Sequence, residues 1–90
     1  MEKLSVIIPA LNEEKTVAEI IARVQRADLG LIAKEIIVVD NGSTDETLAL
    51  ARAIPDIRVI EETTPGKGAA VKRGFREATG DMLLNPRRRP

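Results

Sequence analysis

Residues 35–46 read EIIVVDNGSTDE, an apolar run that passes directly into a polar turn. Four consecutive β-branched residues, 36–39, predict a strand buried on both faces, as in parallel sheets covered by helices. The strand should end at Asp40. In the turn that follows, Ser43 and Glu46 have the spacing of a helix-capping box, so a second helix should start here and end before the next proline.

Strand and helix patterns alternate on both sides of this run. Residues 4–9, 57–60 and 81–84 predict three further strands, and Pro9 is expected to end the first because it lacks an N–H donor. A helix is expected from about residue 12, and another over residues 69–79, closed by Gly80. The order β-α-β-α-β-α-β predicts an α/β fold with a three-layer, Rossmann-like parallel sheet.

The composition limits the chemistry that is open to the chain. Its 90 residues allow one small domain, and the absence of Cys and His excludes disulfides, thiolate metal sites and histidine-based catalysis. The core must be aliphatic, since Phe75 is the single aromatic residue. No apolar run approaches the ~20 residues that cross a bilayer, and no signal peptide is evident, so a cytoplasmic location is expected.

The charge is balanced overall but unevenly distributed. Residues 1–65 carry 7 basic and 12 acidic side chains, whereas residues 66–90 carry 7 basic and 2 acidic ones. A basic end favours an anionic ligand, although three of its cations are the arginines of residues 87–89. Nucleic acid is not expected as a partner, because so few cations make few phosphate contacts and aromatic platforms are missing.

Three polar loops should meet at the carboxyl ends of the predicted strands, where open parallel sheets bind ligands. They are residues 9–13, 40–45 and 65–68. Asp40 could accept hydrogen bonds from a ligand or from the amides of its own turn, and the sequence favours neither. The Gly66-Lys67-Gly68 segment, with a flexible backbone and one cation, has phosphate-binding character but not the spacing of a P-loop.

Four segments in this order resemble a known family. They read SVIIPALNEE (5–14), IIVVDNGSTDET (36–47), GKGAAVKRGF (66–75) and ATGD (78–81). Together they resemble the N-terminal, nucleotide-binding part of inverting family 2 glycosyltransferases with the GT-A fold. Within that family the chain looks most like the dolichyl- or polyprenyl-phosphate sugar transferases. The resemblance covers about residues 4–84.

The resemblance implies hexosyl transfer from a nucleoside diphosphate sugar, of the UDP or GDP type, to an acceptor such as a polyprenyl phosphate. Asp40 matches the aspartate that hydrogen-bonds the base, and Asn41 stands where many members have a second aspartate. The implied nucleotide-binding residues are Pro9, Ala10, Asn12, Glu13, Asp40, Gly66, Lys67 and Gly68.

The end of the chain departs from the family pattern. In the family, the strand opened by Gly80-Asp81 leads into an Asp-x-Asp motif that holds Mg²⁺ or Mn²⁺, whereas here residues 85–90 read NPRRRP. We therefore expect a truncated nucleotide-binding domain over residues 1–84, with a basic tail outside the family pattern. It should lack metal ligands, a catalytic base and transferase activity, and intact relatives could lie at the membrane periphery.

A different class of function stays open. The chain could be a non-catalytic nucleotide-binding or protein-interaction module that self-associates through an exposed sheet edge.

Overall fold

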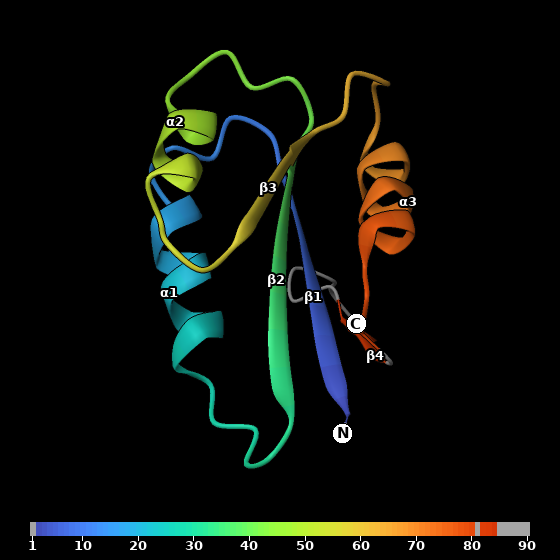
Figure 1. Cartoon of the computed structure of the whole chain (residues 1–90). Helices are drawn as coiled ribbons and strands as arrows, with labels where there is room; N and C mark the ends of the chain where they lie inside the picture. The colour runs from blue at the N-terminus through green and yellow to red at the C-terminus, as the bar shows by residue number, and fades with distance from the viewer. Residues whose placement is uncertain (1, 81, 85–90) are drawn as a thin grey trace.

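The computed structural model describes residues 2–80 and 82–84, and the side chains of residues 2–80. Its strands are β1 (Lys3–Ala10), β2 (Ala33–Asp40), β3 (Arg58–Glu61) and β4 (Met82–Leu84), and its helices are α1 (Val17–Arg26), α2 (Thr47–Arg52) and α3 (Lys67–Glu77). All strand pairs are parallel, in the order β3-β2-β1-β4 (Figure 1). The predicted α/β class and element order are confirmed.

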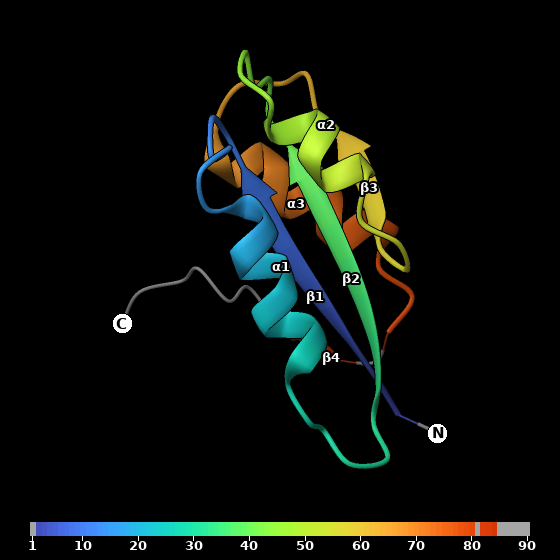
Figure 2. The same ribbon diagram turned by 90° about the vertical axis from the view of Figure 1, so that its left-hand side faces the viewer.

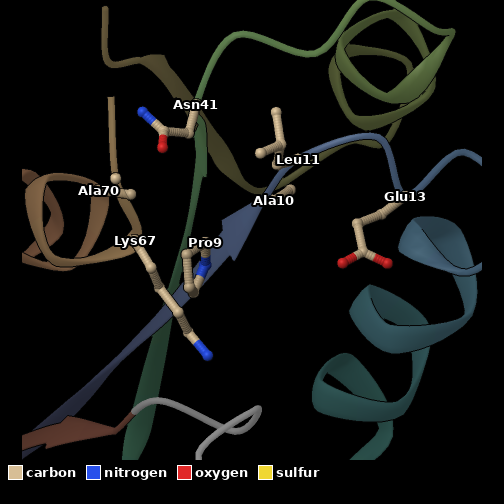
Figure 3. Close-up of a pocket in the computed structure, with 8 residues that line it drawn as sticks. Pro9, Ala10, Leu11, Glu13, Asn41, Lys67 and Ala70 are labelled. Atoms are coloured by element: carbon tan, nitrogen blue, oxygen red, sulfur yellow. The ribbon is translucent and has the colours of Figure 1, made fainter. Parts of the chain in front are cut away.

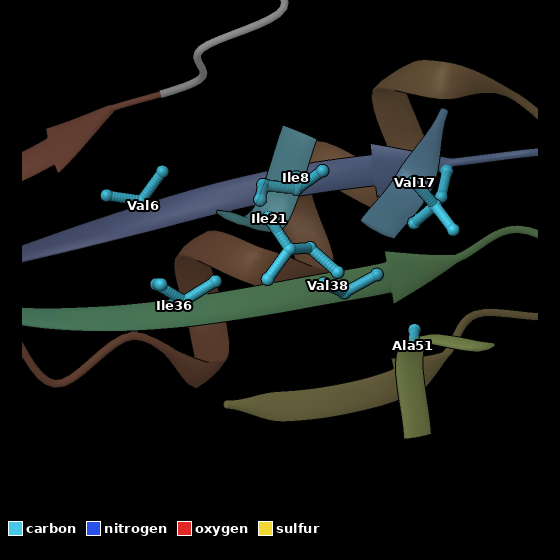
Figure 4. Close-up of a cluster of buried hydrophobic side chains, with 8 residues drawn as sticks. Val6, Ile8, Val17, Ile21, Ile36, Val38 and Ala51 are labelled. Atoms are coloured by element: carbon cyan, nitrogen blue, oxygen red, sulfur yellow. The ribbon is translucent and has the colours of Figure 1, made fainter. Parts of the chain in front are cut away.

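The sheet is the middle of three layers. Helices α1 and α2 cover one face and α3 covers the other (Figures 1 and 2). Because side chains alternate along a strand, β1 and β2 supply both cores. Figure 4 shows the larger core, on the α1 and α2 side, and the smaller one lies beneath α3. The larger core comprises Val6, Ile8, Ala10, Val17, Ile21, Ile36, Val38 and Ala51, and the smaller comprises Ile7, Ile37, Val39 and Ala70.

The register of β1 against β2 places the ends of both strands side by side. Ala10 is opposite Asp40, so the loops that follow these strands leave the sheet at the same edge. The expectation that Pro9 ends the first strand is wrong, since it pairs with Val39 and the strand continues to Ala10. On its other side, β1 pairs with β4 only as far as Val6, so Pro9 lies where that edge has no partner among the described strands.

Two helices begin at positions that the sequence pattern did not predict. Helix α1 begins at Val17 rather than near residue 12, because the backbone N–H of Glu13 donates to Thr47 Oγ1 over 2.7 Å instead of entering a helix. Helix α3 includes Lys67 in its first turn, and the Gly66 carbonyl accepts from the amides of Ala69 and Ala70. Lys67 is thus fixed on a helix rather than carried by a flexible loop.

At the amino-terminal edge of the sheet, Glu35 accepts hydrogen bonds from Thr79, in the segment that follows α3. Its carboxylate accepts hydrogen bonds from Ser5 Oγ (2.8 Å), from the backbone N–H and hydroxyl of Thr79 (2.9 and 3.1 Å), and from Arg58 (3.4 Å). Burial raises the pKa of Glu35, but these hydrogen bonds outweigh it and hold the pKa below its ordinary value of 4.5. Because Thr79 is held here, α3 ends at Glu77 and does not reach Gly80.

The close approach of α3 to β1 requires glycine at position 74. A Cβ added to Gly74 would overlap the side chain of Ile7 and lie 2.7 Å from its Cγ1. Gly68, on the same helix, has open space around the corresponding position.

We predict that Gly74→Ala destabilises the fold. Overpacking costs about 1–3 kcal/mol, which exceeds the gain of about 0.5–1 kcal/mol from replacing a helical glycine. Gly68→Ala is the matched control, and its free energy of unfolding should stay the same or rise. Urea denaturation followed by circular dichroism measures both. Equal unfolding midpoints for the two variants would contradict this account of the packing between α3 and β1.

Candidate functional site

An open cavity of about 330 Å³ lies at the carboxyl edge of the sheet, between the end of β1 and the start of α3. Figure 3 shows that the lining residues come from β1, from the loop after it, from the position that follows β2 and from α3. The cavity is lined by Pro9, Ala10, Leu11, Glu13, Asn41, Gly66, Lys67 and Ala70.

The structure brings five of the eight sequence-predicted residues to this cavity: Pro9, Ala10, Glu13, Gly66 and Lys67. The other three, Asn12, Asp40 and Gly68, are nearby in the chain but outside its lining.

Three further residues line the cavity. Leu11 and Asn41 belong to the predicted loops 9–13 and 40–45, although they are not among the eight implied residues, and Ala70 was missed. The spacing could have identified Ala70, which stands three residues after Lys67 and so shares a helix face with it. Asn41 directly follows Asp40, so the end of β2 brings it to the cavity.

Asp40 has one satisfied and one unsatisfied carboxylate oxygen. Oδ2 accepts from the backbone N–H groups of Gly42 (3.2 Å) and Ser43 (3.1 Å), which is the local turn bonding that the sequence left open. Oδ1 is buried and has no donor among the described residues. Because leaving a buried acceptor unpaired is costly, a ligand N–H or O–H could stabilise it.

The predicted capping box is absent. Neither Ser43 nor Glu46 caps α2 with its side chain, and Ser43 Oγ instead accepts from the backbone N–H of Asn12 over 2.9 Å. In return, Asn12 Oδ1 accepts from the backbone N–H of Thr44, also over 2.9 Å. Asn12 has a left-handed backbone (φ 51°), which asparagine tolerates better than most residues. These bonds lock the loops after β1 and β2 to each other.

Asp45 strengthens the same connection. Its Oδ2 accepts from the backbone N–H of Glu14 over 3.2 Å, while its Oδ1 accepts from the backbone N–H and hydroxyl of Thr47. Desolvation raises the pKa of Asp45, but these hydrogen bonds outweigh it and lower the pKa below its ordinary value. The carboxylate form therefore holds two sequence-distant loops in place.

Lys67 supplies the positive charge of the cavity. Its side chain lines the cavity and runs past Pro9 (Figure 3), and no ion pair joins it to any residue that the structure describes. Arg73, on the same helix, is different because it pairs with Glu62 and Glu77 at 3.3 Å. A cation without a partner next to the first turn of a helix favours an anionic group.

The described residues do not fit the metal that the resemblance implies. Within residues 2–80 and 82–84, no three carboxylate, histidine or cysteine side chains gather closely enough to hold a metal ion. Residue 81 and the predicted basic tail, 85–90, lie outside the described residues.

Among the described helices, none has the length and apolar character to span a bilayer.

In chemical terms, the cavity combines an apolar floor with one cation and several acceptors. Pro9, Ala10 and Ala70, all buried, form its apolar base, the half-exposed Leu11 adds apolar surface, and Lys67 supplies the charge. This arrangement fits a ligand with a planar part and an attached anionic part.

Comparison with known proteins identifies relatives along almost the whole chain. The pattern of the family described as Glycosyl transferase family 2 matches residues 5–85. A dolichol-phosphate mannosyltransferase of Pyrococcus furiosus is 41% identical over 86 residues, which are 91% of this chain and 24% of that protein. A glucosyl-3-phosphoglycerate synthase of Mycolicibacterium smegmatis is 38% identical over 87 residues, 89% of this chain and 28% of that protein.

Solved structures show the same fold. The glucosyl-3-phosphoglycerate synthase of Mycobacterium tuberculosis, in complex with Mn²⁺, UDP and glucosyl-3-phosphoglycerate, matches with a TM-score of 0.77 and 37% identity over 91% of this chain and 32% of its own. TarS 1–349 of S. aureus matches with a TM-score of 0.80 and 31% identity over 92% of this chain and 26% of its own.

The chain thus spans about a quarter to a third of the length of these relatives. The fold is part of a GT-A glycosyltransferase domain, as the resemblance implied. With a family pattern that matches from Ser5 onward through nearly all of the sequence, the chain belongs to glycosyl transferase family 2.

Proposed function

We propose that this chain binds the nucleoside diphosphate part of a sugar nucleotide, in its UDP form, in the cavity at the carboxyl edge of β1 and β2. The observation that carries the proposal is the side chain of Lys67, which lines the cavity beside Pro9 without an ion-pair partner among the described residues. A diphosphate is the anionic group that such a cation, beside the start of α3, would attract.

The remaining groups suit the uridine part of the ligand. The apolar floor formed by Pro9, Ala10 and Ala70 would contact the base. Asp40 lies outside the cavity lining, so its buried Oδ1, which has no donor among the described residues, would accept an N–H of the base only after its turn shifts to expose it. The choice of UDP over GDP follows the relatives, since the glucosyl-3-phosphoglycerate synthase of Mycobacterium tuberculosis has been solved with UDP.

Sugar transfer needs more than this cavity. Transfer of a hexose to a polyprenyl-type acceptor, the type of reaction that the name of the Pyrococcus furiosus relative implies, would require groups that bind a metal and an acceptor. The described residues do not supply the metal ligands. We therefore expect this chain by itself to bind nucleotide weakly and to transfer no sugar. Its cytoplasmic location stays a prediction.

The proposal predicts that Lys67→Ala weakens UDP binding about five- to tenfold, because a charge-assisted contact to the diphosphate is lost. Lys72→Ala is the matched control, since it removes an exposed lysine of the same helix that does not line the cavity. The dissociation constants are measured by titrating UDP into the ¹⁵N-labelled chain and following its NMR signals. Raising the salt concentration should reduce the difference in UDP affinity between the two lysine variants, because salt screens the charge of Lys67.

Equal UDP affinities for the two lysine variants would contradict the placement of the diphosphate. Tighter binding of GDP than of UDP would contradict the assignment of the base.

A second candidate function is self-association through a sheet edge. Within the described residues, β4 pairs only with Leu4–Val6, so the rest of β1 has no strand partner on that side. Strand β3 is the outer strand at the other side of the sheet. Unpaired strand edges can pair with a second copy of the chain.

Size-exclusion chromatography with light scattering tests this alternative. Self-association predicts a mass that rises from 9.8 kDa towards twice that value as the protein concentration increases. A mass that stays at 9.8 kDa throughout would exclude it.

A further inference from the structure

Three chain segments meet at Asn41, the first residue after β2. Its backbone N–H donates to the carbonyl of Ala10, at the end of β1, over 2.9 Å. Its side-chain Nδ2 donates to the carbonyls of Glu62 (3.0 Å) and Thr64 (2.8 Å), in the segment between β3 and α3. Asn41 thus joins one wall of the cavity to the segment that leads into the other.

These contacts require a carboxamide. An Asn side chain has one NH₂ group with two donor hydrogens, and here each can be directed at a different carbonyl oxygen. A carboxylate at position 41 would have no donor and would face both carbonyl oxygens with negative charge. The family resemblance allows an aspartate at this position, but the contacts in this chain do not.

The same segment is also held from α3. Glu62 is 8% exposed, and its carboxylate accepts from the backbone N–H of Thr64 (3.0 Å) and from Arg73 of α3 (3.3 Å). The hydrogen bonds of Thr64 and the charge of Arg73 hold the pKa of Glu62 below its ordinary value. The backbone N–H of Glu62 donates to the Asp40 carbonyl over 2.8 Å, so the segment is fastened to both β2 and α3.

The segment that Asn41 holds lies directly before two residues that line the cavity. Thr64 is only two residues before Gly66, which has a backbone φ of 109°, and three before Lys67, whose side chain lines the cavity. Ala70 and Gly74 are anchored in the core by packing that does not involve Asn41. Loss of the Asn41 donors should therefore displace the start of α3 without unfolding the domain.

We propose that Asn41 is a positioning residue for nucleotide binding in this chain. Its carboxamide fixes the segment from Glu62 to Thr64 and thereby sets the position of Gly66 and Lys67 opposite Pro9 and Ala10. The proposal rests on the function proposed above, because an effect of Asn41 on UDP affinity presupposes that the chain binds UDP.

The test compares UDP affinities of the full 90-residue chain and its variants by NMR titration. Asn41→Ala removes both donors without adding charge and should weaken UDP binding about tenfold. Asn41→Asp should weaken it at least as much, because it adds repulsion. Gln25→Ala is the matched control, since it also removes a side-chain amide that donates across the fold, to the Pro55 carbonyl over 3.3 Å, but far from the cavity. Its affinity should stay within about twofold of the unsubstituted chain.

The UDP affinities refer to folded protein, because they are measured from the dispersed NMR signals of the native state. If Asn41 only stabilised the fold, Asn41→Ala would lower the melting temperature without changing the UDP affinity. Equal affinities for Asn41→Ala and Gln25→Ala would overturn the proposal, and so would a loss confined to Asn41→Asp, which would indicate charge alone. Should Asn41→Ala fail to fold, the proposal is tested instead by the rate at which the Asn41 side-chain NH₂ protons of the unsubstituted chain exchange with water. Slow exchange supports the proposal, and exchange as fast as in a free amide overturns it. Failure of the unsubstituted chain to bind UDP would overturn the proposed function and this inference with it.

Discussion

The parallel pairing of β1 with β2 is the constraint on which the site depends. The register places Ala10 opposite Asp40, so two loops from distant parts of the sequence leave the sheet at one point. Each strand carries apolar residues on both faces, because helices cover both sides of the sheet. Shifting β2 by one residue would exchange its two faces, with Ile37 and Val39 moving to the core of Ile36 and Val38, so the packing of both cores also favours this geometry of the cavity.

Around this edge, polar side chains connect the loops instead of capping the helices. Asn12 and Ser43 join the loops after β1 and β2, while Asn41 joins the end of β2 to the segment before α3. The cavity walls are therefore fixed to one another by amide and hydroxyl groups, together with the carboxylates of Asp45 and Glu62. This leaves Lys67 as a charge at the cavity that is not committed to an ion pair among the described residues, and such a charge is available to a ligand.

Local patterns in the sequence predicted the fold well, because the strands are continuous apolar runs such as residues 36–39. They did not predict where α1 begins, since that depends on the hydroxyl of Thr47, more than thirty residues away, accepting from the amide of Glu13. The cavity was predicted in part for the same reason. The loops that follow the strands were predicted to meet there, whereas the two carbonyls that Asn41 contacts, of Glu62 and Thr64, lie outside the predicted loop 65–68.

The central claim is that the carboxyl edge of β1 and β2 holds the nucleotide, and its most direct test locates UDP on the chain. Intermolecular nuclear Overhauser effects between the uracil protons of UDP and the labelled protein report which side chains lie next to the base. The account predicts such contacts with the methyl groups of Ala10 and Leu11, which line the cavity. Contacts instead at the opposite edge of the sheet, around Glu35 and Thr79, would contradict it.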